Sequence, residues 1–166
     1  MALRSYVRSV TETPCIPERL KDEIDHSEQE ARMVLPGIQA LFGFQLVATF
    51  NSSFKTELSQ GLQNMHLAAL ICVALSVMLV LTPAAYHRQA EAGQISKFFA
   101  KIASAFLTLS MVPMMLGIVL DIYVIARLVT GNLVFATLLA GFFLAGFTTL
   151  WFVFPRIFKR KSASIA

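Results

Sequence analysis

Charged residues are scarce in this chain: only 14% of its 166 residues are Asp, Glu, Lys or Arg, whereas 56% are hydrophobic. A water-soluble domain carries roughly a quarter charged residues. The mean hydropathy is +0.65, and the apolar residues gather into stretches of about 20 or more, long enough as helices to cross a hydrocarbon core about 30 Å thick. These figures exclude an ordinary soluble enzyme and indicate an integral membrane protein.

Cysteine and histidine are too few, or too far apart, for a metal site. Of the 2 cysteines, Cys15 falls in a polar tail and Cys72 in an apolar stretch, so neither a disulfide nor a metal-ligand spacing is expected. His66 and His87 lie at opposite ends of the second apolar stretch, about 31 Å apart by helical rise. No nucleophile–base pair, phosphate loop or dinucleotide motif is present. We therefore expect no metal, no cofactor and no enzyme activity.

Four continuous apolar stretches predict four transmembrane helices, at about residues 35–54, 62–86, 98–126 and 133–154. Helices are expected because an open strand would leave backbone groups unpaired in lipid, and a β-barrel would alternate with a period of two. The links are short and contain Asn, Ser or Gly, so neighbouring helices should be antiparallel. The predicted fold is an all-α, four-transmembrane-helix up-and-down bundle over residues 35–155.

Lys and Arg are divided unequally between the two sides of this bundle. Twelve belong to the N-terminal tail (1–34), the second loop with its flanks, and the C-terminal tail (156–166), whereas only Lys55 and Arg127 fall on the other side. Because positively charged segments stay in the cytoplasm, both termini are predicted to be cytoplasmic. The first ten residues hold no apolar run, so no cleavable signal peptide is expected.

The N-terminal tail is predicted to form an amphipathic cytoplasmic helix. Its apolar and small residues recur at helical spacing: Leu20, Ile24, Ser27, Ala31 and Val34. Residues 27–30 resemble a capping box, and Pro36 disfavours helix at Leu35. One continuous helix and a helix that ends near His26 both fit this pattern, and we favour the break. Such a helix could dock a cytoplasmic protein partner.

The first span is the most polar, and contains Gln39, Gln45, Thr49 and Ser52 among aliphatic and aromatic residues. Gln45 and Thr49 share a helix face, which Ser52 extends. Amides are costly in hydrocarbon, so this face should meet protein or water. Two interpretations stay open: hydrogen bonds between helices, or the lining of a permeation or binding path.

Small residues recur every four positions in the other three spans, a pattern that lets helices approach closely. These stripes are Ala68, Cys72 and Ser76; Ala100, Ser104 and Thr108; and Thr137, Gly141, Ala145 and Thr149. We predict that they are packing seams, either within one chain or between chains.

The third span holds a proline and an acid. Pro113 removes a backbone donor near its middle, so we expect a kink and a candidate hinge. Asp121 lies about 30 Å of helix beyond Lys101, close to the outer surface. We expect Asp121 to pair with Arg127 or Lys55. The alternative is a proton-accepting or cation-attracting role as a charge at the outer mouth of a path.

Aromatic and basic residues mark two exits from the membrane on the predicted cytoplasmic side. Such residues anchor helix ends and favour anionic lipid headgroups. The candidate anchors are Tyr86, His87 and Arg88 after the second span, and Trp151, Arg156, Lys159 and Arg160 at the end of the fourth. They account for the basic charge without nucleic-acid binding.

Two motifs resemble a bacterial family of small four-span membrane proteins of unknown function. They are Leu35-Pro36-Gly37-Ile38-Gln39-Ala40-Leu41-Phe42-Gly43-Phe44 and Pro83-Ala84-Ala85-Tyr86-His87-Arg88. Both occur in order within residues 18–131, although residues 89–93 depart from the basic, aromatic run usual in that family. The resemblance implies the four-span fold and a bacterial inner (plasma) membrane. It implies no activity.

A small membrane protein with a polar first span is expected to act as a homo-oligomeric channel or transporter-like protein for an ion, a proton or a small solute. One four-helix bundle is too small to enclose a roomy aqueous path, so several copies would surround it, with the first span lining the path. The alternative is an accessory or structural membrane protein that transports nothing and docks a partner on its N-terminal helix.

Overall fold

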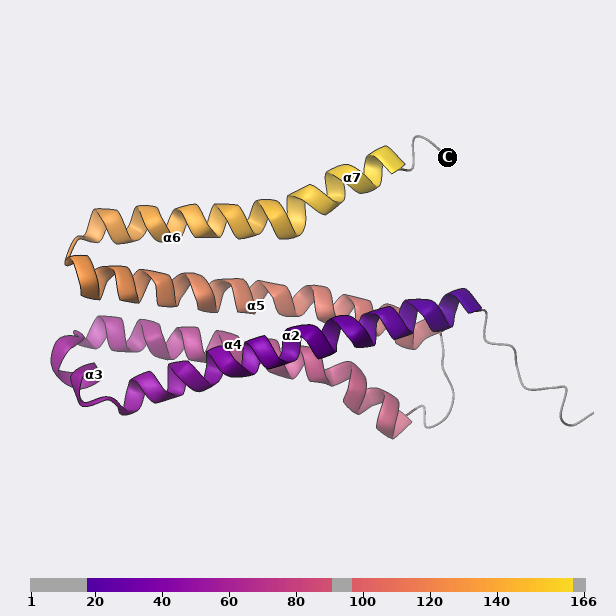
Figure 1. Ribbon diagram of the computed structural model, residues 1–166, viewed down its shortest axis with the longest axis horizontal. Helices are drawn as coiled ribbons and strands as arrows, with labels where there is room; N and C mark the ends of the chain where they lie inside the picture. The colour runs from indigo at the N-terminus through magenta and orange to yellow at the C-terminus, as the bar shows by residue number, and fades with distance from the viewer. Residues whose placement is uncertain (1–17, 91–96, 163–166) are drawn as a thin grey trace, which may run out of the picture.

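A computed structural model describes residues 18–90 and 97–162, almost all of them helical. Four of its helical segments are long and apolar enough to cross a membrane: Gln29–Phe50, Gln60–Gln89, Phe98–Thr130 and Leu133–Phe158. They lie side by side and alternate in direction (Figure 1). The predicted all-α four-span bundle is therefore confirmed.

The first long helix, α2 (Glu18–Phe50), is continuous, so the predicted break near His26 is wrong. Pro36 lies inside α2 and removes only the hydrogen bond that its missing N–H would give to the carbonyl of Arg32. Ala31, Leu35 and Ile38, on both sides of this proline, pack in one cluster with α4. Burial along this face outweighs the local preference of the residue before proline.

A short helix, α3 (Ser52–Glu57), follows α2 and precedes α4 (Gln60–Ala90). The first span had been expected to run to residue 54, but it ends at Phe50. Asn51 caps α3 because its side-chain oxygen accepts a hydrogen bond from the Ser53 N–H at 3.1 Å. The chain therefore turns across the end of the bundle instead of passing directly into α4.

The third span is α5 (Lys97–Thr130), which joins α6 (Leu133–Thr148) through a tight turn. Gly131 adopts φ +65° there, a conformation that glycine adopts without strain. The Asn132 side chain then accepts hydrogen bonds from the Val134 and Phe135 N–H groups and so caps α6. This turn lies where the sequence predicted the last link.

The fourth span continues past α6 through a π-helical turn, η1 (Thr149–Val153), into α7 (Phe154–Ser162). Pro155 has no N–H to donate to the Trp151 carbonyl, and the wide π turn directly precedes it. The axis of α7 bends away from that of α6 at this point (Figure 1).

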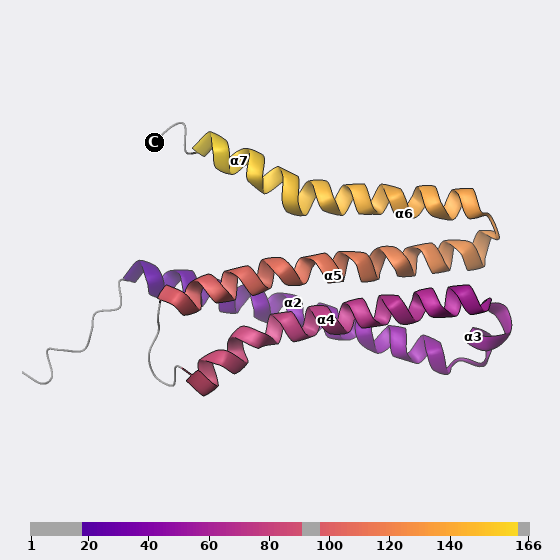
Figure 2. The same cartoon turned by 180° about the vertical axis from the view of Figure 1, so that it is seen from behind.

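The four spans do not pack equally. Helices α2, α4 and α5 contact one another, whereas α6 packs chiefly against α5, on the side away from α4 (Figures 1 and 2). As a result, the small residues Thr137, Gly141 and Ala145 on α6 are exposed on the single chain. The stripe predicted on this span is therefore not a seam within the chain.

Helices α4 and α5 approach each other closely at Gly117, which is buried. A Cβ atom at this position would lie 2.7 Å from Val73 Cγ2 and 3.0 Å from the carbonyl oxygen of Ala69. A side chain there would force the two helices apart. Nearby, the buried Ser76 hydroxyl donates to the Ser110 carbonyl at 2.9 Å and ties the same pair of helices together.

Replacing Gly117 with alanine should therefore lower the free energy of unfolding by about 1–3 kcal/mol, the usual cost of overpacking. The matched control is Gly146→Ala, because a Cβ at Gly146 meets nothing within 4 Å. The control should leave stability unchanged or raise it by up to about 1 kcal/mol through helix propensity. Denaturant titration in detergent measures both, and equal shifts would contradict the close approach.

Candidate functional site

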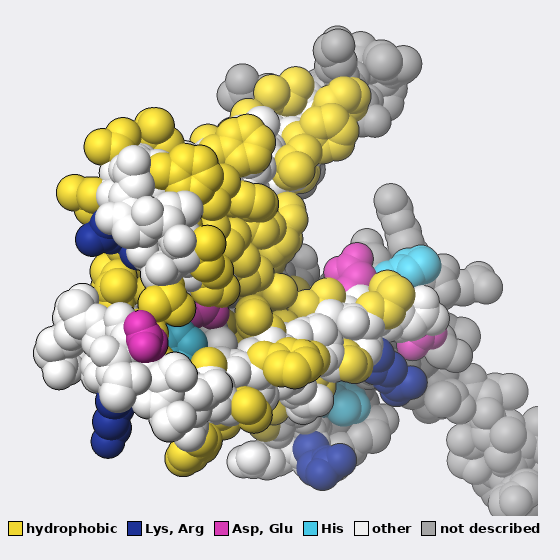
Figure 3. Space-filling view, turned by 60° about the vertical axis from the view of Figure 1, so that its left-hand side comes forward, with side chains coloured by type: hydrophobic (Ala, Val, Ile, Leu, Met, Phe, Trp, Pro, Cys, Tyr) yellow, Lys and Arg dark blue, Asp and Glu magenta, His cyan; other side chains and the backbone are white. Residues whose placement is uncertain are grey.

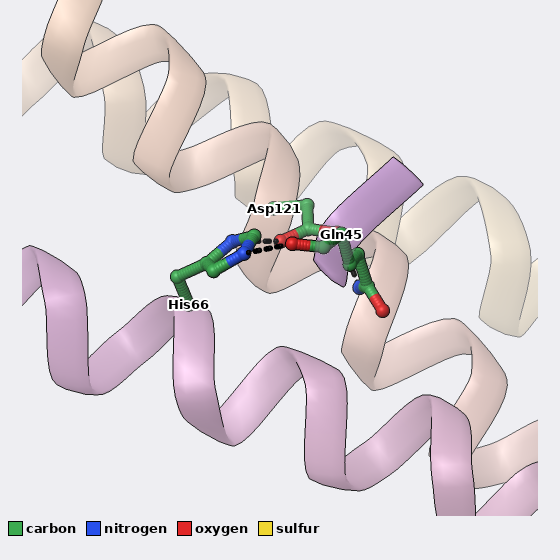
Figure 4. A network of polar contacts seen from close by, with 3 residues as sticks. All are labelled: Gln45, His66 and Asp121. Atoms are coloured by element: carbon green, nitrogen blue, oxygen red, sulfur yellow. Dashed lines mark hydrogen bonds and ion pairs between the residues drawn. The ribbon is translucent and has the colours of Figure 1, made fainter. Parts of the chain in front are cut away.

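Three long helices each bring one polar side chain to a common point between them. These are Gln45 from α2, His66 from α4 and Asp121 from α5 (Figure 4). Each lies about one to three turns inside the end of its helix. Because hydrocarbon offers no hydrogen-bond partner, such groups are stabilised by pairing with one another.

The contacts among these residues form a closed set. The Gln45 Nε2 amide donates to Asp121 Oδ2 at 2.5 Å, and His66 Nδ1 lies 3.1 Å from Asp121 Oδ1. The other ring nitrogen, His66 Nε2, lies 3.1 Å from the backbone carbonyl oxygen of Gln45. Both carboxyl oxygens and both ring nitrogens therefore have a partner.

These contacts restrict where a proton can lie in the site. A backbone carbonyl can only accept, so a hydrogen bond from the ring to the Gln45 carbonyl needs a proton on Nε2. With that proton in place, a hydrogen bond between Nδ1 and Oδ1 needs one further proton between them. That proton belongs either to an imidazolium that donates to a carboxylate or to a carboxylic acid that donates to a neutral ring. If that proton is lost, Nδ1 and Oδ1 face each other as two acceptors. If the remaining ring proton then moves to Nδ1, Nε2 loses its hydrogen bond to the Gln45 carbonyl.

The site is shielded from solvent but keeps one free acceptor. Gln45 is 3% exposed, and the side chains of His66 and Asp121 are 9% and 14% exposed. The ring of Phe54, from α3, packs edge-on against His66 with centroids 5.3 Å apart. Within the described part of the chain, the buried Gln45 Oε1 has no hydrogen-bond partner. It points away from His66 (Figure 4).

A cavity of about 500 Å³ adjoins the site between α2, α3 and α5. Its wall is mostly apolar. The polar residues in the wall include the three site residues and side chains of α3. The lining residues include Leu41, Phe44, Gln45, Phe54, Glu57, His66, Ile118, Asp121 and Ile125. Figure 3 shows histidine (cyan) and acidic (magenta) side chains recessed between hydrophobic surfaces on this side of the molecule.

Asp121 does not have the partner that the sequence predicted. It was expected to pair with Arg127 or Lys55, but it bonds to His66 and Gln45. Arg127 instead donates to the Gly131 carbonyl at 2.6 Å, four residues further along and within easy reach. A carboxylate this far inside the bundle is stabilised by the buried groups that face it, not by cations at the surface.

Of the four candidate path-lining residues, only Gln45 joins the site. Gln39 and Ser52 are exposed, and Thr49 donates to the Leu46 carbonyl of its own helix at 2.7 Å. The Gln45 side chain donates its hydrogen bond to another helix. This agrees with the first of the two interpretations of the polar face, hydrogen bonds between helices. A role for the other three in a path between copies stays a prediction.

His66 was not predicted to be a partner of the acid. Its residue type and spacing were interpreted only for metal binding. The sequence feature that could have predicted this pair is the position of the two residues along their helices. His66 and Asp121 are both ionisable and lie in apolar helices near the same end of the bundle. Pro113 lies within α5, which continues on both sides of it, and its role as a hinge stays a prediction.

The candidate anchors lie at the opposite end of the bundle. Tyr86 packs edge-on against Phe98, and His87 packs against Phe99 with ring centroids 4.9 Å apart. Trp151 packs against Phe147, while Arg88 and Arg156 are exposed. The side chains of Lys159 and Arg160 lie outside the described part of the structure, as does Cys15.

Across residues 18–90 and 97–162, no three His, Cys, Asp or Glu residues gather closely enough to hold a metal ion. The site is therefore a hydrogen-bonded acid–imidazole–amide cluster in an all-α protein with four membrane-spanning helices. The chain belongs to a family of unknown function (DUF6328), whose model matches residues 15–155. No curated protein and no solved structure matches the chain.

Replacing Asp121 with leucine should lower the free energy of unfolding by about 1–3 kcal/mol, because buried donors on His66 and Gln45 lose their acceptor. The matched variant is Asp121→Asn. Its amide can donate to Nδ1 and accept from Gln45, so its cost should stay below about 1 kcal/mol. Unfolding in detergent distinguishes the two, and an equal loss would show that the hydrogen bonds do not stabilise the fold.

Proposed function

We propose that this chain is a small bacterial inner-membrane transport protein that acts as a homo-oligomer and exchanges a proton at His66 and Asp121, with Gln45 as the hydrogen-bond donor that positions the acid. The observation that carries the proposal is the part-buried acid–imidazole pair beside a cavity between the membrane-spanning helices. An ionisable pair in such a place is costly to bury and is commonly part of an ion or proton pathway.

A proton is the species that the pair itself can bind and release. Nδ1 and Oδ1 are 3.1 Å apart and share one proton, so a second base or water at Asp121 can remove it without moving a helix. His66 and Asp121 both line the cavity. Among the described lining residues, the other titratable side chain is that of Glu57 on α3. Among the described lining residues no Lys or Arg is present.

The cavity supports a solute with a hydrogen-bond donor or a positive charge. Its volume of about 500 Å³ lies in the range of small-molecule sites. The free acceptor Gln45 Oε1 and the acids Glu57 and Asp121 accept hydrogen bonds, and Phe44 and Phe54 offer aromatic faces. A cation fits such a wall better than an anion does.

The homo-oligomeric part of the proposal is supported by α6. This helix packs on one side against α5 and leaves Thr137, Gly141 and Ala145 exposed. Small residues at this spacing let a second helix approach closely in lipid. A second copy of the chain would cover this face.

The direct test is proton uptake into liposomes that contain the purified full chain and a pH-sensitive dye, with a potassium potential as the driving force. We expect uptake above protein-free vesicles, and at least a tenfold loss in Asp121→Asn, whose amide cannot release the shared proton. Asp25→Asn is the matched control, because Asp25 is exposed at the other end of α2.

Gln45→Leu should likewise abolish flux and leave assembly intact, whereas Gln29→Leu on the same helix should not change flux, because Gln29 is exposed at the other end of α2. Unchanged flux in both Gln45→Leu and Asp121→Asn would overturn the assignment of the site.

The oligomeric state should be a closed ring of four or more copies when the chain is extracted with its surrounding lipid and weighed by native mass spectrometry. A monomer or a dimer leaves no room for a central path and contradicts that part of the proposal. The flux assay tests the proton site separately, because all three of its residues come from one chain.

A further inference from the structure

A second hollow lies at the opposite end of the same three helices. It has a volume of about 400 Å³ and is lined by α2, α4 and α5. The inner wall is apolar and consists of Leu35, Val80, Leu81, Pro83, Phe99 and Leu107. Pro83 lies inside α4, and beyond it the end of α4 diverges from α5 (Figures 1 and 2). The bend leaves space between the helices.

The rim of this groove is basic. Arg32 from α2 and His87 and Arg88 from α4 line it, and none of its described lining residues is acidic. Both arginines are exposed, which places them at the mouth of the groove. Arginine suits a phosphate in particular, because its planar fork donates two parallel hydrogen bonds.

His87 supplies an independent observation. Its ring packs against Phe99 with centroids 4.9 Å apart, which fixes the ring at the groove wall. Its Nδ1 atom is buried and has no hydrogen-bond partner in the described part of the chain. The same atom is closed to a ligand in the groove. The fixed ring therefore marks the place where the apolar wall of the groove meets its basic rim.

We propose that this groove binds one anionic phospholipid, with its phosphate between Arg32, His87 and Arg88 and an acyl chain along the apolar wall. A lipid is the occupant that matches both halves of the groove, because it joins an anionic headgroup to a hydrocarbon chain. A soluble phosphate would satisfy the rim and leave the wall uncovered. The basic end is the one predicted to be cytoplasmic, where anionic lipids are attracted by positive charge.

This lipid site is separate from the proton site and does not depend on it. It makes the second motif of the sequence a recognition element: Pro83 forms part of the apolar wall, while His87 and Arg88, one turn later, lie at the headgroup. The first motif contributes Leu35 to the wall, directly before Pro36.

The test uses the purified full chain with an equimolar mixture of phosphatidylglycerol and phosphatidylcholine, and native mass spectrometry of the retained lipid. We expect phosphatidylglycerol to be retained preferentially. Arg88→Gln and Arg32→Gln should each lower that preference about fivefold, the usual contribution of one basic residue near an anionic surface. Lys101→Gln is the matched control, because it removes the same charge from an exposed position on α5 outside the groove.

Three results would overturn the site. The first is an equal loss of preference in Lys101→Gln, which would mean that total charge and not the groove selects the lipid. The second is an unchanged preference in the Arg32→Gln, Arg88→Gln double variant whose melting temperature matches the parent. The third is displacement of the lipid by millimolar inorganic phosphate or glycerol phosphate, which would identify a site for small anions instead.

Discussion

The fold depends on a constraint that water does not impose: a polar group inside hydrocarbon must find its partner within the protein. Gln45, His66 and Asp121 meet this constraint together, and in doing so they hold α2, α4 and α5 at one end. The close contact at Gly117 and the Ser76 hydrogen bond to the Ser110 carbonyl hold α4 and α5 further along. Helix α6 lies outside this polar framework and packs against α5 through apolar surfaces.

The features predicted correctly from the sequence are those that depend on local properties. Hydropathy over about 20 residues identifies a membrane span, and the turn at Gly131 and Asn132 is recognisable from its residue types. The break near His26 was wrong because Leu35 and Ile38 pack against α4, and a proline rule that considers only neighbouring residues cannot include that burial. The short helix α3 was missed although Asn51 is a good capping residue.

The site itself could be predicted only in part. The polarity of Gln45 and the acid at Asp121 are visible in the sequence, and bonding between helices was one of the interpretations. The sequence does not show which residues these two bond to. That depends on how three helices, far apart in the chain, are rotated and shifted along their axes relative to one another. His66 lies 55 positions from Asp121 and 21 from Gln45. Arg127, which is closer to Asp121 in sequence, bonds elsewhere.

The contact between His66 Nε2 and the Gln45 carbonyl has a directional consequence. A carbonyl oxygen holds a hydrogen bond but cannot carry a proton away, so exchange with the surroundings is closed on that side of the ring. In the proton exchange proposed above, the imidazole would therefore gain or lose its proton through the Nδ1–Oδ1 contact and the carboxyl group of Asp121. On that proposal the histidine is the inner position of the pair, and the acid is the position that faces the cavity.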